Sequence, residues 1–175
     1  MIAVCRDGEH RFSKSPTDRI EIIAGLGVRG DAHAGEKVQH LSRVRADPDQ
    51  PNLRQVHLIH AELFDELTDK GFSLRAGDLG ENITTRGIDL LSLGRETVLR
   101  VGPEVVLKVT GLRNPCAQIE AFATGLLKEV AIKTDAGIVR KAGIMTIAVE
   151  GGRVVPGDII EIETHDGPHI PLERV

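Results

Sequence analysis

Large aromatic side chains are almost missing from this sequence. Among 175 residues there is no tryptophan and no tyrosine, and only four residues are phenylalanine. The core must therefore be filled by valine, isoleucine, leucine and alanine. Proteins that hold single-stranded nucleic acid stack its bases on aromatic rings, so a binding platform of that kind is not expected here.

Cysteine is also scarce, with only Cys5 and Cys116 present. Two cysteines do not make the disulfide framework of a small secreted protein. The N-terminus has neither a basic region nor a long apolar stretch, so it does not read as a secretory signal. We therefore expect a cytoplasmic protein with reduced thiols.

No charge of one sign dominates, because 22 basic side chains face 26 acidic ones and leave a formal net charge of −4. No stripe of lysine and arginine stands out, and we expect neither nucleic acid nor a membrane surface as a partner. The longest apolar runs are far shorter than the ~20 residues that span a bilayer.

The chain is rich in turn-forming residues, with 19 glycines and 8 prolines, and its length fits a single domain over residues 1–175. Short runs rich in valine and isoleucine predict strands at residues 2–5, 21–26, 55–59, 97–101, 105–110, 145–149, 153–155 and 159–163. Helices are expected at 61–70 and 124–133, and residues 42–54 read as a long exposed loop. Many short strands with few helices predict a mainly β protein, either a closed barrel or a sandwich.

Two polar loops contain the first candidate site residues. Asp31 and His33 are two positions apart, so on an extended segment both side chains project to the same side. The carboxylate could orient the imidazole or help hold a metal, or it could simply bond the backbone of a turn. Residues 77–85 combine two glycines with Glu81, Asn82 and Thr84, which is typical either of a ligand-binding loop or of an ordinary one.

Cys116 follows a predicted strand and comes three residues after Arg113. A nearby guanidinium favours thiolate over thiol, as a nucleophile, a sulfur carrier or a metal ligand requires. The alternative is a buried structural thiol, which is the interpretation for Cys5 in its apolar run.

The histidines give weaker signals. His57 lies within the strand predicted at 55–59 and His60 follows it, and both are expected to be structural or surface groups more often than ligands. His165 and His169 lie in a tail rich in glycine and proline and are expected in solvent. Neither a zinc-ligand spacing nor a nucleophilic serine elbow is present.

Taken in order, these motifs resemble the MOSC domain, named for the C-terminal domain of molybdenum cofactor sulfurases. The resemblance is to small stand-alone bacterial members, including the group linked to resistance to N-hydroxylated purines, and it covers residues 28–163. The matching segments are Gly30-Asp31-x-His33-x-Gly35, Gln55-Val56-His57-Leu58-Ile59, Gly77-x-x-Gly80-Glu81-Asn82-Ile83-Thr84, Gly87-x-Asp89-Leu90, Arg113-Asn114-Pro115-Cys116 and Gly157-Asp158.

The resemblance implies a closed, mostly antiparallel β-barrel similar to the barrel domain of pyruvate kinase, with a few short helices. It also implies a pocket for a molybdopterin-type molybdenum cofactor, with Cys116 as the catalytic residue that either ligates molybdenum or carries a persulfide. The cofactor-binding residues that it implies are Lys14, Asp31, His33, Gly80, Glu81, Asn82, Thr84 and Arg113.

Three functions follow as hypotheses. The first is the catalytic component of an oxidoreductase that reduces N-hydroxylated bases, a small-molecule substrate, with a redox partner in trans because the chain has no flavin or iron–sulfur module. The second is a sulfur carrier that receives a persulfide on Cys116 from a donor protein, without turnover of its own. The third is a plain binding barrel in which Cys116 is inert. Motif order and chain length favour the first.

Overall fold

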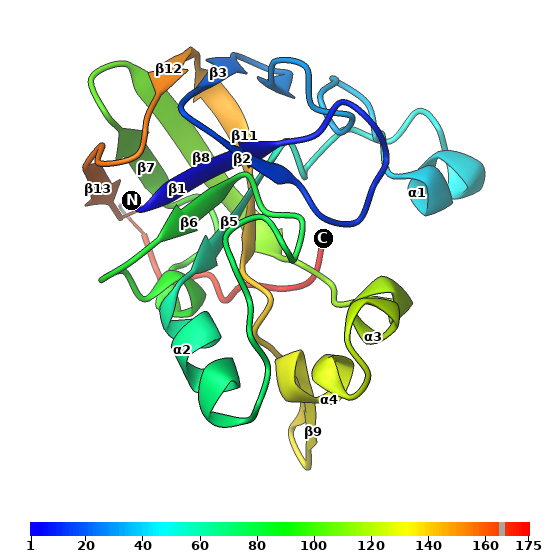
Figure 1. Cartoon of the computed structure of the whole chain (residues 1–175). Coiled ribbons are helices and arrows are strands. Elements are labelled where there is room, and N and C mark those ends of the chain that lie inside the picture. The colour runs from blue at the N-terminus through cyan, green and yellow to red at the C-terminus, as the bar shows by residue number, and fades with distance from the viewer. Residues whose placement is uncertain (165–166) are drawn as a thin grey trace.

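The computed structural model describes residues 1–164 and 167–175. In this part of the chain thirteen strands form three sheets, and short helices lie at their margins (Figure 1). The protein is therefore mainly β, as the sequence predicts.

The largest sheet has eight strands. In spatial order they are β13 (Ile160–Glu163), β7 (Val98–Val101), β8 (Val105–Leu112), β11 (Ile144–Glu150), β5 (Val56–His60), β6 (Ile83–Thr85), β1 (Ala3–Arg6) and β2 (Ser15–Thr17). Neighbouring strands are antiparallel except for β5 and β6, which are parallel.

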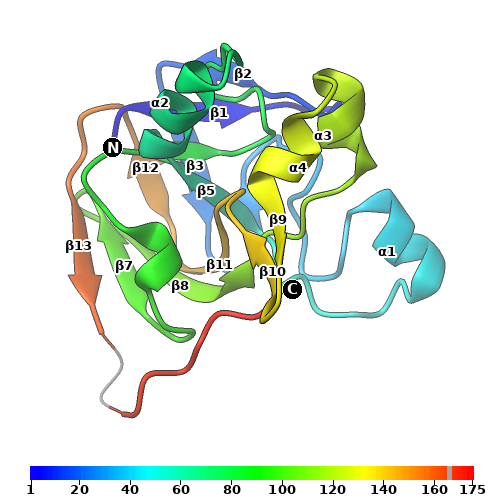
Figure 2. The same cartoon turned by 90° about the horizontal axis from the view of Figure 1, so that it is seen from below.

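This sheet curls into a half-barrel that hydrogen bonds do not close (Figure 2). The expectation of a closed barrel is not confirmed, because β13 and β2 lie at opposite ends of the strand order. Proline lacks an N–H donor and suits an edge strand, and β2 contains Pro16. The curl itself comes from the long β8–β11 pair, where the register shifts after Met145 and after Ala148; such bulges bend a strand.

A second sheet of three strands, β12 (Gly152–Val154), β3 (Ile20–Ile23) and β4 (Gly27–Val28), packs against the curled sheet. The main core lies between the two and consists of aliphatic side chains that are buried from solvent, among them Val4, Ile22, Leu58 and Leu107. Small aliphatic residues thus fill the core, as the lack of large aromatics requires.

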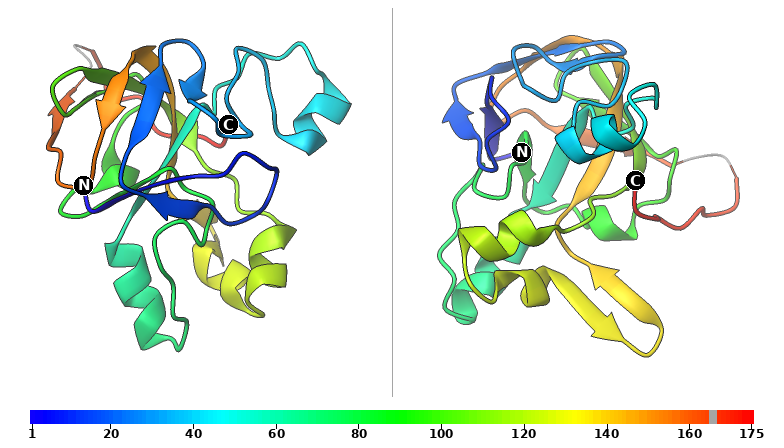
Figure 3. Two further views of the ribbon diagram at one scale, coloured as in Figure 1. Left: turned by 45° about the horizontal axis from the view of Figure 1, so that its top comes forward. Right: turned by 90° about the vertical axis from the view of Figure 1, so that its right-hand side faces the viewer.

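A second apolar cluster forms where three helices meet one end of the large sheet (Figure 1). These helices are α2 (Glu62–Asp69), α3 (Ala117–Phe122) and α4 (Leu126–Val130). Leu63, Phe64 and Leu67 form the buried face of α2. One further helix, α1 (Leu41–Ala46), stands away from the body of the molecule (Figure 3). Between the elements there is also a single 3-10 turn, η1 (Leu90–Ser92).

The eight predicted strands are all present within one or two residues at most ends, and the helix predicted at 61–70 is α2. The helix predicted at 124–133 is wrong in its second half, where β9 (Ala131–Thr134) pairs with β10 (Gly137–Arg140). β-Branched residues in that half favour a strand. The predicted loop at 42–54 contains α1. Among the described residues, no helix has the length and apolar character needed to cross a bilayer.

Candidate functional site

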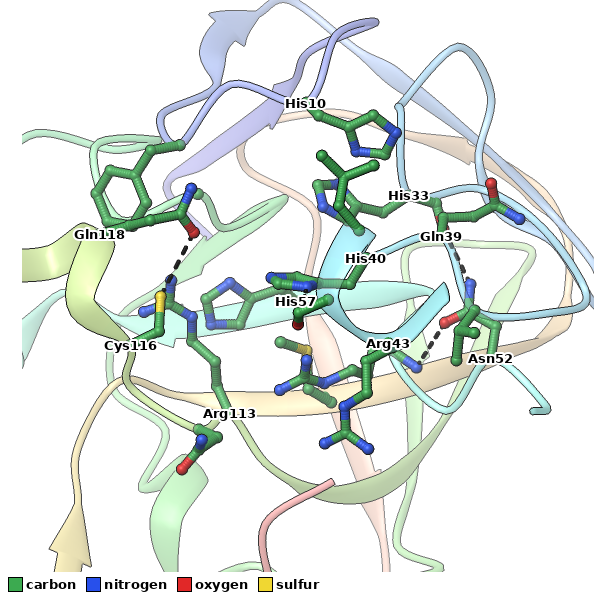
Figure 4. Close-up of a pocket in the computed structure, with 18 of the residues that line it drawn as sticks. His10, His33, Gln39, His40, Arg43, Asn52, His57, Arg113, Cys116 and Gln118 are labelled. Carbon is green, nitrogen blue, oxygen red and sulfur yellow. Dashed lines mark hydrogen bonds between the residues drawn. The ribbon is translucent and has the colours of Figure 1, made fainter. Parts of the chain in front are cut away.

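A cavity of about 470 Å³ opens beside the curled sheet and is lined by residues of α1 and α3 (Figure 4). Six parts of the chain line it: the loop before β2, the segment from His33 through α1, the approach to and start of β5, the loop at Gly80 and Asn82, the segment after β8 that leads into α3, and Met145 of β11. The open sheet makes this possible, because strand ends and connections converge here. Its volume is within the ~300–1,000 Å³ typical of ligand sites.

The cavity is strongly basic although the chain as a whole is acidic. Its cationic side chains are Arg11, Lys14, Arg43, Arg45, Arg54 and Arg113. Four histidines, His10, His33, His40 and His57, also line it, and none of its lining residues in the described chain is an aspartate or glutamate. A low-dielectric wall of one charge sign is an attractive site for an anion.

Asp31 sits just behind the wall and ties several lining residues together. Its Oδ2 accepts hydrogen bonds from Lys14 Nζ at 2.7 Å and Asn82 Nδ2 at 2.9 Å. Its Oδ1 is 3.2 Å from His33 Nδ1 and accepts from the His33 backbone N–H at 2.9 Å. Burial alone would raise the pKa of Asp31, but the hydrogen bond from His33 and the charge of Lys14 outweigh it and hold the pKa well below its usual range. Asp31 is thus both a turn residue and an orienting group for His33.

Arg113 and Arg54 differ from Asp31, because each has a buried side-chain nitrogen without a hydrogen-bond partner. Arg113 Nη1 and Arg54 Nε are inaccessible to solvent, and no described residue accepts a hydrogen bond from either atom. Burial lowers the pKa of Arg113, and burial followed by the charges of Arg43 and Arg113 lowers the pKa of Arg54 to about 10. Both groups stay charged at neutral pH. A buried donor without an acceptor is unfavourable, so these two positions favour an anionic ligand.

The glycine loop at residues 77–80 serves the protein's own backbone more than a ligand. A Cβ at Gly77 would lie 2.1 Å from the Lys14 carbonyl oxygen, and one at Gly80 would lie 2.5 Å from that of Phe12. Both glycines have positive φ, which side chains disfavour. The loop therefore holds the Phe12–Lys14 segment against the cavity, with the Lys14 N–H donating to the Gly77 carbonyl at 2.8 Å.

Glu81 and Thr84 lie behind this loop. Glu81 is fully buried, and its Oε1 accepts from the Gly77 N–H at 2.6 Å and from Thr84 Oγ1 at 3.1 Å. Burial raises the pKa of Glu81. Neither residue lines the cavity; both support the loop that does.

Cys116 lines the cavity and Cys5 does not. Cys116 is partly exposed and precedes α3, with Sγ 3.4 Å from Gln118 Oε1, and Figure 4 places its sulfur beside the Arg113 guanidinium. A thiolate at Cys116 would stabilise the charges of both Arg113 and Arg54. Cys5 is buried in the core, and burial raises its pKa to about 12, which confirms its interpretation as a structural thiol.

Two cavity histidines are neutral at physiological pH. His57 is buried, with Nε2 2.8 Å from the Ala142 carbonyl oxygen, and burial followed by the charge of Arg113 lowers its pKa well below the usual value. Burial, with the charges of Arg54, His33 and Arg113, lowers the pKa of His40 to about 4. The expectation of a structural His57 holds, although its ring also faces the cavity (Figure 4).

The remaining histidines add little. His60 lies at the end of β5, outside the cavity lining, and His169 is exposed, whereas His165 lies outside the described residues. Among the residues that the structure describes, no group of three or more His, Cys, Asp or Glu side chains is arranged to hold a metal ion.

Of the residues predicted from sequence, six line the cavity: Lys14, His33, Gly80, Asn82, Arg113 and Cys116. Asp31, Glu81 and Thr84 support it from behind. Sequence reasoning missed His40, Arg43, Arg45 and Arg54. Three of these fall in or next to the segment read as an exposed loop, and its arginine content was the available signal.

Comparisons with known proteins establish the family and the fold. The family model for the MOSC domain matches residues 30–161. The fold is similar to the crystal structure of the YuaD protein from Bacillus subtilis, with a TM-score of 0.76 and 22% sequence identity over 94% of each chain.

Two YiiM proteins share the fold as well. The one from Geobacillus stearothermophilus has a TM-score of 0.65 and 17% identity over 97% of this chain and 76% of that chain. The one from Escherichia coli has a TM-score of 0.65 and 15% identity over 96% of this chain and 71% of that one. A comparison with curated protein sequences gives no match. Because the family model spans most of the sequence, the chain belongs to the MOSC domain family.

Proposed function

We propose that this protein binds a molybdopterin-type molybdenum cofactor in the cationic cavity and is the catalytic component in the reduction of N-hydroxylated bases. The observation that carries the proposal is the position of Cys116, a soft sulfur donor, in a cavity whose lining is basic and whose buried Arg113 and Arg54 have unpartnered nitrogens. MOSC domains are associated with molybdenum cofactor proteins.

The donor set fits such a group at both ends. A pterin phosphate needs fixed N–H donors, and Arg113 and Arg54 provide them without losing an existing partner. Thiolate sulfur is a preferred ligand of soft metal centres, and Cys116 is the only cysteine of the chain on the cavity wall. When bound, the cofactor would supply two-electron redox chemistry.

The chain's own residues then hold the substrate and protons. Reduction of an N-hydroxylamine to an amine consumes two electrons and two protons and releases the hydroxyl oxygen as water. His33 is placed to hold one proton, because Asp31 Oδ1 engages its Nδ1 and leaves Nε2 free for the cavity. The electrons must come from a redox partner acting in trans.

The decisive experiment is a cofactor assay after expression in a host that makes the cofactor. We expect molybdenum and pterin in near-equal amounts with the wild-type protein, loss of molybdenum in Cys116→Ala, and retention in Cys5→Ala, which removes the buried thiol. Wild-type levels of molybdenum in Cys116→Ala would refute the ligand role of Cys116.

A sulfur carrier is the second candidate, and the partial exposure of Cys116 favours it, because persulfide transfer needs an accessible sulfur. Incubation with a cysteine desulfurase and cysteine, followed by intact-protein mass spectrometry, distinguishes the two. A carrier gains the mass of one sulfur atom on Cys116, and the Cys116→Ala variant gains none.

A further inference from the structure

Helix α1 is held at the cavity mouth without help from the core. None of its six residues is buried, and its apolar Leu41 and Val44 are 51% and 36% exposed. No side chain caps its N-terminus. An isolated helix this short is unstable in water, so local propensity does not explain its presence. The segments on either side of α1 must therefore hold it in place.

The base of the α1 segment is anchored firmly. Val38 N–H donates to the Gln50 carbonyl at 3.0 Å and Asn52 N–H donates to the Glu36 carbonyl at 2.8 Å, so the two ends of the segment pair. The buried Asn52 side chain adds donations to the carbonyls of His33 and Gly35 at 2.9 and 3.0 Å. These bonds fix where α1 leaves and rejoins the body (Figure 3).

From this position α1 contributes two arginines to the cavity. Arg43 and Arg45 both line it, and neither forms an ion pair with any acidic residue in residues 1–164 and 167–175. By contrast, Lys14 pairs with Asp31, and Arg11 pairs with Asp7 and Glu9. Four of the six cationic groups of the cavity therefore lack an acidic partner in the described chain: Arg43, Arg45, Arg54 and Arg113.

A single phosphate group does not neutralise these four cations. A phosphomonoester carries about −1.5 to −2 at neutral pH. In the proposed function Arg113 and Arg54 hold the phosphate of the cofactor, since their unpartnered nitrogens are buried at the inner wall. The two α1 arginines also line the cavity, and Figure 1 shows α1 apart from α3, the helix that follows Cys116. Neither arginine has an acidic partner in the described chain, so a second anionic group would find two available guanidinium groups there.

We propose, resting on that function, that the substrate carries a phosphate and that Arg43 and Arg45 bind it, so that the N-hydroxylated base is taken as a nucleoside monophosphate rather than as a free base. Guanidinium groups match phosphate oxygens with paired hydrogen bonds. Leu41 and Val38 line the same side of the cavity and give the base or sugar an apolar contact. In this arrangement α1 binds the phosphate and the base extends towards Cys116.

Binding is tested first, with unreactive probes on the purified, cofactor-containing protein. Calorimetric titrations with AMP, adenosine and inorganic phosphate separate the contributions of the nucleoside and the phosphate. We expect AMP to bind at least about tenfold more tightly than either adenosine or phosphate, because charge-assisted hydrogen bonds to the phosphate add to the contacts of the nucleoside.

The Arg43→Gln/Arg45→Gln double variant should remove most of the preference for AMP over adenosine. Arg19→Gln, an exposed arginine outside the cavity, is the matched control and should keep it. Equal affinities for AMP and adenosine, equal affinities for AMP and phosphate, or an unchanged preference in the double variant would each overturn the proposal.

A turnover assay distinguishes failure of the phosphate-site proposal from failure of the reductase function on which it rests. The substrates are N6-hydroxyadenine, its nucleoside and its nucleoside monophosphate, assayed with one artificial electron donor. We expect kcat/KM to be highest for the monophosphate, mainly through a lower KM, and the double variant to lose that advantage. Turnover of all three with equal kcat/KM refutes the phosphate site and keeps the reductase. Absence of turnover with AMP-selective binding refutes the reductase and keeps the phosphate site.

Discussion

Two charged clusters meet at the cavity, and they differ in whether their buried groups have hydrogen-bond partners within the protein. Around Asp31 every charge has a partner: Lys14, His33 and Asn82 satisfy both carboxylate oxygens within the protein. Around Arg113 and Arg54 buried nitrogens are left without acceptors. The first cluster completes its interactions on folding, whereas the second would complete them only on binding the ligand of the proposed function. Substitutions in the first should therefore affect stability, and substitutions in the second should affect binding.

Lys14→Met should have the largest effect on stability. The Lys14 and Asp31 side chains are 4% and 2% exposed, so the variant leaves a buried carboxylate without its cation. We expect the free energy of unfolding to fall by about 3–5 kcal/mol in urea denaturation. Lys37→Met is the control, because the Lys37 and Asp49 side chains of that ion pair are 61% and 78% exposed, and its effect should stay below about 1 kcal/mol. Similar losses in the two variants would contradict the distinction.

Acidification should produce a smaller loss from the cluster of unpaired cations. The pKa of His40 is about 4 in the folded protein against 6.5 in an unfolded chain, so between these values the unfolded state binds more protons and stability falls as the pH falls. His57 acts in the same direction. Asp31 acts in the same direction, because its folded-state pKa is also depressed, but its contribution is lost only at lower pH, as the pH falls below its usual pKa of 3.8.

Urea denaturation at several pH values between 4 and 7 measures this slope. His40→Gln should reduce it, and a slope equal to that of the wild type would show that burial and the nearby cations do not lower the pKa of His40. Inorganic phosphate bound between the arginines should raise the pKa of His40, which is observable as a shift in its ring resonances by NMR.

Arg113→Met should have the smallest effect on stability. The guanidinium is buried with an unpartnered nitrogen, so replacing it by an apolar side chain of similar length removes as much unfavourable desolvation as favourable contact. We expect the free energy of unfolding to change by less than about 1 kcal/mol, together with a loss of affinity for inorganic phosphate of at least about tenfold. A destabilisation as large as that of Lys14→Met would place Arg113 in the structural cluster.

Much of the fold could be predicted because its strands are short runs of β-branched residues between turn residues. Two of the missed strands lack that signal. β2 contains Pro16, and β6 reads as part of a polar loop, although Thr84 and Thr85 are fully buried there. Sheet closure depends on twist and bulges accumulated over many strands, such as the shifts at Met145 and Ala148, and no local pattern encodes it.

The candidate site was predictable where its residues are neighbours in sequence, as in the Asp31–His33 and Arg113–Cys116 motifs. Its charge was not. The arginines come from positions 43, 45, 54 and 113, separated by acidic and apolar residues, and only the tertiary fold brings them to one cavity. A net charge of −4 gave no indication of such a site.

That contrast between a basic cavity and an acidic chain acts on the approach of ligands as well as on their binding. At physiological salt the Debye length is about 8 Å, so a small anion at the mouth feels the arginines and little of the distant surface. A long polyanion must also lie along the acidic exterior, where it is repelled. The position of the arginines inside the cavity therefore selects ligands by size as well as by charge, and favours the capture of small anions over polymers.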